Sequence, residues 1–344
     1  MPLSFGIRIP PCEPLREVAA AARAAEAAGF DHVWTLDSPL LAGRLLDPYL
    51  ALGACAAATA RARLGVAVTN PLIRHPLATA AAILSLDDLS GGRAVLGLGS
   101  GDSAMRTLGL AAADDVGTHA GRRRQLRESV ETLAAVFAGK SVTFGPRAFQ
   151  LEAPHRAIPI YVAATGARML ELAGAVADGV IIQVGVDERC VGWAIEQIHA
   201  GARGAGRDPA RVDVVCSTFT AIDEDRRRAI DRARPLTAWF YGVAPELLRM
   251  AGIDVTRRVP LSPVFPDISH PADHERAMEE ARRYVTDEAV ERMCLVGPAA
   301  ECIERIRRLA RLGVGQIFFR HYLTYRVPTE LIETAGREIL PRFR

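Results

Sequence analysis

The sequence predicts an α/β fold, specifically a (β/α)8 TIM barrel with insertions. Short apolar runs typical of strands alternate along the chain with alanine-rich segments of helical pattern. These runs are nearly continuous in apolar residues, as expected when both faces of a parallel sheet are buried. We count eight strands, most of them followed by a helix, in 344 residues, which fits such a barrel. A doubly wound open sheet is the alternative.

The first half of the chain contains four predicted strand–helix units. The strands span residues 4–10, 32–37, 63–70 and 94–101, and the helices span residues 13–29, 48–59, 76–89 and 120–138. Gly29 is a stop signal for the first helix, because glycine readily adopts the left-handed conformation that ends a helix. A polar stretch near residues 140–152 then predicts a hairpin on the surface of the barrel.

The second half continues this alternation and contains one long interruption. The strands span residues 158–165, 179–185, 212–222 and 316–322, and the helices span residues 167–176, 188–204, 224–240, 299–313 and 329–339. The stretch near 243–296 fits no strand–helix unit well and is rich in proline. We expect a long insertion that shapes a substrate pocket or a subunit contact. Residues 1–344 are expected to form a single barrel domain.

The charge balance and the cysteine pattern argue against several classes of protein. Lys and Arg number 42 against 40 Asp and Glu, and this net charge of +2 favours neither a nucleic-acid binder nor a membrane binder. No apolar run is long enough to span a bilayer, and the N-terminal residues do not resemble a signal peptide. The six cysteines are scattered without a CxxC motif, which argues against a metal site or a disulfide framework. We therefore expect a cytoplasmic protein.

Polar residues stand at the ends of the otherwise apolar strands. In a TIM barrel the carboxyl ends of the strands surround the active site, so these residues converge on one mouth. A polar residue at a strand end can also cap the next helix or bind loop backbone, and this alternative stays open for each of them. The candidates selected by position alone are Arg8, Asp37, Asn70, Ser100, Asp102, Thr165, Gln183, Thr218, and Arg320 or His321.

Two of these strand ends consist of small residues. The segment 99–101 contains two glycines, which let backbone amides approach a ligand closely, although its spacing matches neither a dinucleotide-binding motif nor a Walker loop. Thr165 and Gly166 lie at the start of a helix, where free N–H groups and the helix dipole favour an anion. Two such strand ends suit a flat ring system with a phosphate tail.

The segment 68–102, VTNPLIRHPLATAAAILSLDDLSGGRAVLGLGSGD, resembles the luciferase-like flavin- and deazaflavin-dependent barrel superfamily. It is most similar to the coenzyme F420-dependent methylenetetrahydromethanopterin reductase branch. Further matches in family order cover most of the chain, and these are shared across the superfamily. They are GFDHVWTLD (29–37), IPIYVAATG (158–166), ADGVIIQ (177–183) and GPAAECIERIRRLARLGV (297–314).

The resemblance implies how the third strand ends and how a coenzyme binds. In F420-dependent barrels this strand bulges at a non-prolyl cis peptide, which maps onto Ala67–Val68. The bulge would back the central ring, and Asn70 would hydrogen-bond the coenzyme. The alternative is a plain strand end with an Asn-Pro turn. The cofactor-binding residues carried over are Asp37, Ala67, Val68, Asn70, Ser100, Gly101, Asp102, Ala163, Ala164, Thr165 and Gly166, the last four along the phosphate-bearing tail.

Two positions depart from the family pattern. Ser38 follows Asp37 where the family often has a histidine, the catalytic group of a relative that oxidises a sugar phosphate, so that chemistry is not expected here. Arg8 stands where the reductase branch has a glutamate, so the pterin substrate itself is not carried over. A buried arginine there needs an anionic partner, which is either a substrate group or an internal acid such as Asp37 or Asp102.

Few residues are needed for catalysis, because a deazaflavin carries the hydride transfer itself. Asp102 is the first candidate for a proton relay, with His75 and His321 behind it, and Asp37 completes the catalytic set. His75 can also simply begin a helix. The substrate-binding candidates are Arg8, Gln183 and His321.

The sequence and the resemblance together indicate an oxidoreductase that transfers hydride between coenzyme F420 and an organic substrate. One alternative is an FMN-dependent monooxygenase of the same superfamily, with FMN in place of F420. Another is a non-catalytic barrel that binds a small molecule. The expected partners are a small-molecule substrate and, as is usual in the family, a second copy of the chain in a homodimer.

Overall fold

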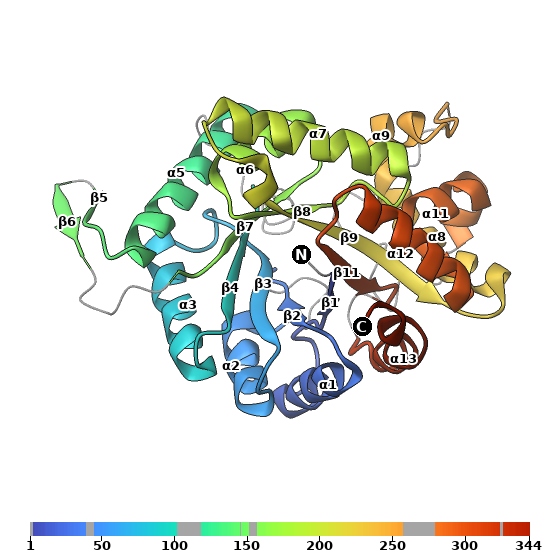
Figure 1. Ribbon diagram of the computed structural model, residues 1–344, viewed down its shortest axis with the longest axis horizontal. Helices are drawn as coiled ribbons and strands as arrows, with labels where there is room; N and C mark the ends of the chain where they lie inside the picture. The colour runs from blue at the N-terminus through green and yellow to red at the C-terminus, as the bar shows by residue number, and fades with distance from the viewer. Residues whose placement is uncertain are drawn as a thin grey trace.

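Eight parallel strands of the described chain close into a barrel, which confirms the predicted fold class (Figure 1). The computed structural model describes residues 3–38, 45–101, 118–144, 146–150, 157–256, 279–323 and 326–344. In order around the barrel, the strands are β1 (Ser4–Arg8), β2 (His32–Thr35), β3 (Arg63–Thr69), β4 (Ala94–Leu98), β7 (Ile160–Ala164), β8 (Gly179–Ile182), β9 (Asp213–Ile222) and β11 (Gln316–His321). Each strand pairs in parallel with the next, and the pairing of β11 with β1 closes the ring.

Helices surround the barrel and mostly follow the strands as predicted (Figure 1). They are α1 (Leu15–Ala28), α2 (Pro48–Ala58), α3 (Pro76–Ser90), α5 (His119–Phe137), α6 (Ala167–Val176), α7 (Glu188–Gly204), α8 (Arg226–Val243), α12 (Ala299–Arg311) and α13 (Thr329–Thr334). Gly29 ends α1 with a φ of 104°, which confirms the predicted stop signal. Asp47 and Asp187 begin α2 and α7, because their carboxylates accept hydrogen bonds from N–H groups of the first turn.

The two predicted insertions have secondary structure of their own. The hairpin consists of β5 (Val142–Phe144) and β6 (Arg147–Phe149), which pair antiparallel. The longer insertion begins with α9 (Pro245–Met250) and ends with α11 (Asp287–Met293) and β10 (Leu295–Gly297), while its prolines at 260–271 lie outside the described residues. β10 pairs in parallel with the last residues of β9. A strand of three residues is too short to be detected from its pattern.

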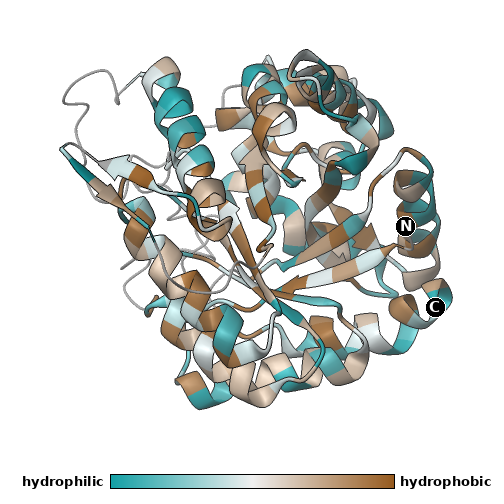
Figure 2. Ribbon diagram, turned by 60° about the vertical axis from the view of Figure 1, so that its left-hand side comes forward, coloured by the Kyte–Doolittle hydropathy of each residue, from teal (hydrophilic) through white to brown (hydrophobic). Residues whose placement is uncertain are grey.

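Two sets of apolar side chains form the core. Hydrophobic residues lie along the strands and on the helix sides that face them, and hydrophilic residues lie on the outer sides of the helices (Figure 2). Inside the barrel a separate apolar group, here called the plug, fills the lumen, so that the barrel is a packed core and not a pore. The plug consists of Trp34, Val95, Tyr161, Ile181, Val215 and Phe318.

A polar layer closes the N-terminal end of the barrel below the plug. Gln316 accepts a hydrogen bond from Trp34 Nε1 at 2.9 Å and donates one to His32 Nδ1 at 2.8 Å. Tyr161 donates its hydroxyl to Asp213 Oδ2 at 2.9 Å. Burial lowers the pKa of His32 to about 3, so the ring is neutral. These groups satisfy one another and join strands that are far apart in the sequence.

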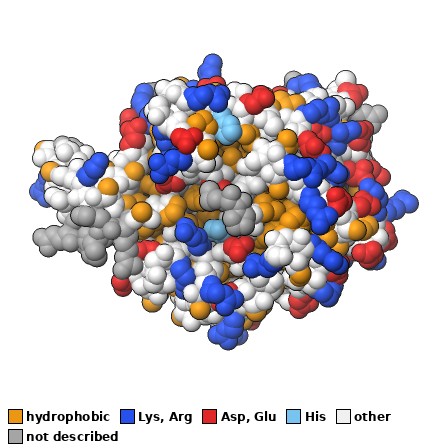
Figure 3. Space-filling model, in the orientation of Figure 1, with side chains coloured by type: hydrophobic (Ala, Val, Ile, Leu, Met, Phe, Trp, Pro, Cys, Tyr) orange, Lys and Arg blue, Asp and Glu red, His pale blue; other side chains and the backbone are white. Residues whose placement is uncertain are grey.

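The surface carries charges of both signs. On the face shown in Figure 3, Lys and Arg side chains are interspersed with Asp and Glu over the outer helices, and hydrophobic side chains gather toward the middle. The part of the chain that the structure describes has no helix long and apolar enough to cross a membrane and no cluster of three metal-binding side chains. All six cysteines are buried, and none of them forms a disulfide.

Candidate active site

β3 ends irregularly at the C-terminal end of the barrel, here called the mouth. The peptide bond Ala67–Val68 is cis, as predicted, and the pairing of β3 with β4 shifts register between Val66 and Thr69. The Val68 side chain occupies space that β4 leaves free, because a Cβ on Gly99 would lie 2.6 Å from Val68 Cγ2. The predicted bulge is therefore confirmed, and Gly99 makes room for it.

Three small or apolar residues form a floor over the plug. Ala67, Val68 and Ala163 are half-buried and pack against the plug residues. They come from β3 and β7, which lie on either side of β4 in the barrel. Together they present an apolar surface at the mouth. Such a surface suits the face of a flat ring, which gains from apolar contact and leaves its polar groups at the edge.

Asn70 shapes the turn after β3. It is buried, and its Oδ1 accepts hydrogen bonds from the backbone N–H groups of Leu72 and Ile73 at 3.1 and 3.2 Å. Gly101 packs against this turn with a φ of +79°, and a Cβ there would lie 2.6 Å from Leu72 Cδ1. Ser100 precedes it and is half-buried. Within the described residues Asn70 Nδ2 has no hydrogen-bond partner, so this donor is available to a ligand.

Asp37 is a buried carboxylate held by two donors. It is 1% exposed, and its Oδ2 accepts hydrogen bonds from Thr69 Oγ1 and Arg74 Nε, both at 2.7 Å. Arg74 also donates to Asp47 Oδ2 at 2.5 Å and lies over the Tyr49 ring, 4.6 Å from its centroid. Asp37 Oδ1 is buried and has no hydrogen-bond partner among the residues that the structure describes. The carboxylate therefore keeps one acceptor free.

α6 begins at the mouth with an open N-terminus. Its N-cap is Gly166, which provides no capping side chain, and no described atom lies within 4 Å of a Cβ built there. Thr165 is half-buried and Gly166 is exposed, so the first N–H groups of α6 are accessible. Ala164 is buried and accepts a hydrogen bond from the Gln183 backbone N–H at 3.3 Å. The residues predicted along the phosphate tail thus meet at one helix N-terminus.

Arg8 and Gln183 lie at the mouth, at the end of β1 and just after β8. Arg8 is 6% exposed and Gln183 is half-buried. Of the two acids offered as internal partners of Arg8, Asp37 forms its ion pair with Arg74. Asp102 lies outside the described residues, so its roles as proton relay and coenzyme contact stay predictions.

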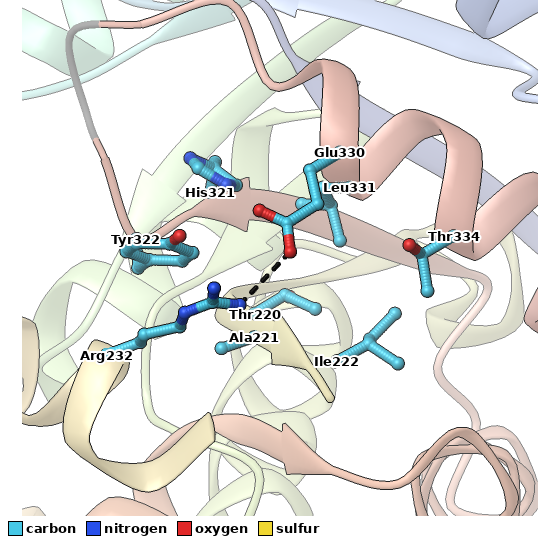
Figure 4. A pocket seen from close by; sticks show the side chains of 9 residues that line it. All are labelled: Thr220, Ala221, Ile222, Arg232, His321, Tyr322, Glu330, Leu331 and Thr334. Carbon is cyan, nitrogen blue, oxygen red and sulfur yellow. Dashed lines mark hydrogen bonds and ion pairs between the residues drawn. The ribbon is translucent and has the colours of Figure 1, made fainter. Parts of the chain in front are cut away.

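His321 lies in a separate pocket beside the barrel, between the ends of β9 and β11 and the helices α8 and α13 (Figure 4). An ion pair between Arg232 and Glu330 at 3.1 Å lines this pocket. His321 Nδ1 accepts a hydrogen bond from the Leu323 N–H at 3.1 Å, and burial lowers the pKa of the ring to about 4. In the described chain, none of the other predicted site residues lines this pocket, so the structure does not bring His321 together with the floor.

Three more candidates make contacts that stabilise the fold. Thr218 Oγ1 accepts a hydrogen bond from the Leu295 N–H at 3.2 Å and so joins β10 to β9. The Arg320 guanidinium lies over the Phe219 ring, 4.1 Å from its centroid. His75 is exposed and is the N-cap of α3, where its Nδ1 accepts a hydrogen bond from the first turn at 3.3 Å. For His75, this is the helix-starting role that the sequence offered as an alternative to catalysis.

Comparison with known protein families identifies the fold family. The family model described as luciferase-like monooxygenase matches residues 4–316. The chain belongs to this luciferase-like family. It is 34% identical over 324 residues to the 5,10-methylenetetrahydromethanopterin reductase of Methanolobus tindarius, which covers 92% of this chain and 93% of the relative. It is 30% identical to the F420-dependent glucose-6-phosphate dehydrogenase of Nakamurella multipartita, over 95% of this chain and 92% of that relative.

Solved structures of luciferase-like proteins have the same barrel. The coenzyme F420-dependent tetrahydromethanopterin reductase from Methanopyrus kandleri matches with a TM-score of 0.82 at 27% identity, and the match covers 100% of both chains. An F420-dependent secondary alcohol dehydrogenase in complex with an F420–acetone adduct matches with a TM-score of 0.77 at 19% identity, which shows likeness of fold alone. The predicted resemblance to the F420-dependent reductase branch is confirmed.

Sequence reasoning gave no role to Arg74 or Thr69 in this luciferase-like site. Both lie in or next to the segment that ends β3 and leads to Pro76. Arg74 stands in a link of only a few residues between a strand end at the mouth and the next helix. This position in the sequence could have predicted a role for Arg74 at the site, because so short a link keeps its side chains near the mouth. Asp47, the second acid that Arg74 holds, could be expected only as the N-cap before Pro48.

Proposed function

We propose that the protein is an oxidoreductase that transfers hydride between coenzyme F420 and a small organic substrate. The observation that carries the proposal is the apolar floor of Ala67, Val68 and Ala163, in a chain related over almost its whole length to F420-dependent enzymes. An FMN-dependent monooxygenase of the same family would use the same floor. The test below distinguishes the two, because it compares both coenzymes directly.

The residues at the mouth fit a flat ring with polar edges and an anionic tail. The floor supports the face of the ring, while Asp37 Oδ1 and Asn70 Nδ2 offer a buried acceptor and a donor at its edge. The open N-terminus of α6 at Gly166 favours a phosphate. When bound, the deazaflavin supplies the hydride chemistry. The protein holds the ring, satisfies its polar edge and excludes water from its face.

We propose the predicted residues as the site, with their roles as follows. The catalytic set is Asp102, His75 and Asp37, with Asp102 as the first candidate for proton relay because His75 caps α3. Arg8 and Gln183, which lie at the mouth, are proposed for the substrate, and a substrate role of His321, whose pocket lies beside the barrel, stays a prediction from the sequence. The coenzyme-binding set is Asp37, Ala67, Val68, Asn70, Ser100, Gly101, Asp102, Ala163, Ala164, Thr165 and Gly166.

Arg8 is proposed to read an anionic group of the substrate. It is buried at the mouth, at the end of β1, and a guanidinium there has the planar fork of donors that binds a carboxylate or phosphate. In that role, Arg8→Gln should raise the KM for the substrate far more than the Kd for the coenzyme. If the melting temperature and the coenzyme affinity of Arg8→Gln fall together instead, Arg8 serves the fold and not the substrate.

The experiment that tests the function is a titration of the purified protein with coenzyme F420 and, separately, with FMN, followed by fluorescence quenching. We expect F420 to bind at least about tenfold more tightly than FMN, a difference of about 1.4 kcal/mol. Tighter binding of FMN supports the monooxygenase alternative. Binding of neither coenzyme supports the non-catalytic barrel and overturns the proposal.

The homodimer is proposed to form through the outer faces of α2 and α3. α2 contains no charged residue, and three leucines on this side are exposed: Leu46 by 49%, Leu50 by 68% and Leu89 by 59%. An apolar face is self-complementary when a two-fold axis brings it onto a second copy. Light scattering should report a dimer, and Leu50→Glu should dissociate it. Leu312→Glu, which changes an exposed leucine at the end of α12, is the matched control that should stay dimeric.

The remaining expectations are part of the same proposal. We take residues 1–344 as one domain, with a small-molecule substrate and with neither a nucleic-acid nor a membrane partner. A cytoplasmic location agrees with six free cysteines, since thiols persist in a reducing compartment.

A further inference from the structure

Arg74 joins the buried carboxylate at the mouth to the helix beside it. Its Nε donates to Asp37 Oδ2 and its Nη2 donates to Asp47 Oδ2. Asp47 in turn caps α2, because its Oδ1 accepts hydrogen bonds from the Tyr49 and Leu50 N–H groups. The guanidinium is thus fixed between two acids and an aromatic ring. Such a bidentate bridge is a geometry that lysine cannot reproduce.

The two bonds that Asp37 accepts fall on the same oxygen. Thr69 and Arg74 both donate to Oδ2, while Oδ1 is buried without a partner in the described part of the chain. Leaving a buried acceptor unsatisfied is unfavourable, so such an atom in a native structure calls for an explanation. A donor that arrives with a ligand provides one.

Thr69 links the Asp37 carboxylate to the strand that carries the floor. Thr69 directly follows Val68, which is a floor residue, and its hydroxyl holds Asp37 at 2.7 Å. Asp37 itself lies just beyond the C-terminal end of β2, where barrel enzymes bind their ligands. The carboxylate therefore lies at the same end of the barrel as the floor.

Arg74 stays charged in this setting. Burial alone would lower the pKa of Arg74, but the charge of Asp37 and the hydrogen bonds to both acids raise it above its ordinary value. Burial would likewise raise the pKa of Asp47, but the hydrogen bonds from Leu50 and Arg74 lower it. Arg74 therefore stays charged between the two acids, and its pair with Asp47 persists over the ordinary pH range.

We propose that Arg74 is a positioning residue, which holds Asp37 by Oδ2 so that Oδ1 accepts a hydrogen bond from an N–H or O–H group of the bound ring. The inference rests on the proposed function, since the ring is the one that lies on the floor. It assigns Arg74 no contact with the ring itself. Its effect on binding passes through Asp37 alone.

A double-mutant cycle on coenzyme binding tests this. We expect Asp37→Asn to raise the F420 Kd at least about tenfold, because Asn offers one acceptor oxygen to three donors, namely Thr69, Arg74 and the ring. We expect Arg74→Met to raise it at least about tenfold as well, because Asp37 then loses the donor that holds its Oδ2. The double variant should bind within about twofold of the weaker single variant, since both changes remove the same contact. Arg74→Lys should lose about three- to tenfold, because one ammonium cannot hold both acids in the same fork. Arg74→Lys keeps the positive charge, so it replaces Arg74→Met in the cycle if Arg74→Met does not fold.

Arg93→Met is the matched control. Arg93 is also half-buried, but its guanidinium binds Thr59 Oγ1 and backbone oxygens at the N-terminal ends of β3 and β4. Arg93→Met should lower the melting temperature and leave the F420 Kd within about twofold. The same result for Arg74→Met, or multiplying effects in the double variant, overturns the proposal.

The outcome for Arg74 can be separated from the outcome for the coenzyme. If the unmodified protein binds FMN and not F420, the coenzyme assignment fails and the cycle is measured with FMN, whose ring also carries an N–H donor. A coupled cycle then still supports the role of Arg74, and an uncoupled one rejects it. If neither ring binds, both proposals fail.

Discussion

The two ends of the barrel treat their buried polar groups differently. At the N-terminal end, Gln316 satisfies His32 and Trp34, and Tyr161 satisfies Asp213. At the mouth, Asp37 Oδ1 is buried without a hydrogen-bond partner among the described residues. A closed polar layer stabilises the fold, whereas a buried acceptor without a partner calls for an explanation. The difference agrees with the proposal that the mouth is the functional end.

The largest expected effect at the mouth is that of filling the space behind Val68. A Cβ on Gly99 would lie 2.6 Å from Val68 Cγ2, so Gly99→Ala must push the floor. We expect the coenzyme Kd to rise roughly 30-fold or more, which is a loss of about 2 kcal/mol in binding free energy. Fluorescence quenching measures this change.

Two other glycines sharpen this comparison. Gly65 lies deeper in the barrel, where a Cβ would approach Val95 Cγ2 to 2.4 Å. Gly65→Ala should therefore cost about 1–3 kcal/mol of stability and leave the coenzyme affinity unchanged in the folded protein. Gly192→Ala, inside α7 where no described atom lies within 4 Å, should leave the coenzyme affinity unchanged and raise stability by about 0.5–1 kcal/mol, because alanine favours a helix. If Gly99→Ala behaves like Gly65→Ala, the floor does not contact the coenzyme.

A smaller effect is expected at the N-terminus of α6. Thr165→Asp places a negative charge where the phosphate tail is proposed to bind. The coenzyme Kd should therefore rise roughly 5- to 30-fold, a loss of about 1–2 kcal/mol in binding free energy. Thr165→Asn has a similar shape without the charge and should bind nearly normally. Equal affinities for the two variants, with folding intact, would place the tail elsewhere.

The smallest expected effect concerns pH and separates the histidines of the two ends. Burial lowers the pKa of His32 to about 3 and that of His321 to about 4, from 6.5 in the unfolded chain. Below pH 6.5 the unfolded state therefore binds more protons than the folded state, and the free energy of unfolding falls as the pH falls. Each ring should cost about 1.4 kcal/mol at pH 5.5.

Urea unfolding at pH 8 and pH 5.5 checks this. His32→Asn and His321→Asn should each remove about that share of the loss, and the two effects should add because the rings lie at opposite ends of the strands. Saturating coenzyme should not change the part of this loss of stability that His32 causes, because His32 lies in the closed polar layer. If neither variant reduces the loss of stability between pH 8 and pH 5.5, groups other than these two histidines cause it.

The sequence predicted the barrel well and the contacts at its mouth only in part. Continuous apolar strands and helix signals such as Gly29 act locally, so the eight strands and most helices were predicted within a few residues. The bulge at Ala67–Val68 was available only through the family resemblance. Arg74 could not be assigned, because its partners Asp37 and Asp47 are distant in sequence and meet only when β2, β3 and α2 pack together.

Some strand-end candidates were selected by a rule that ignores which way a side chain points. Thr218 lies within β9 and contacts β10, and His321 ends β11 but lies in a pocket with α8 and α13. Alternate residues of a strand point to opposite sides, so a shift of one position decides between lumen and outer layer. The pattern of apolar residues cannot settle that choice in strands that are buried on both faces.

The most direct test of the central claim is hydrogen–deuterium exchange of the protein with and without coenzyme F420. The account predicts slower amide exchange at the mouth on binding and unchanged exchange in the closed polar layer at the other end. The mouth segments are 67–70, 99–101 and 163–169, and the closed-end segments are 4–6, 30–34, 213–215 and 315–317. Protection confined to the closed end, or bound coenzyme with no protection at the mouth, would contradict it.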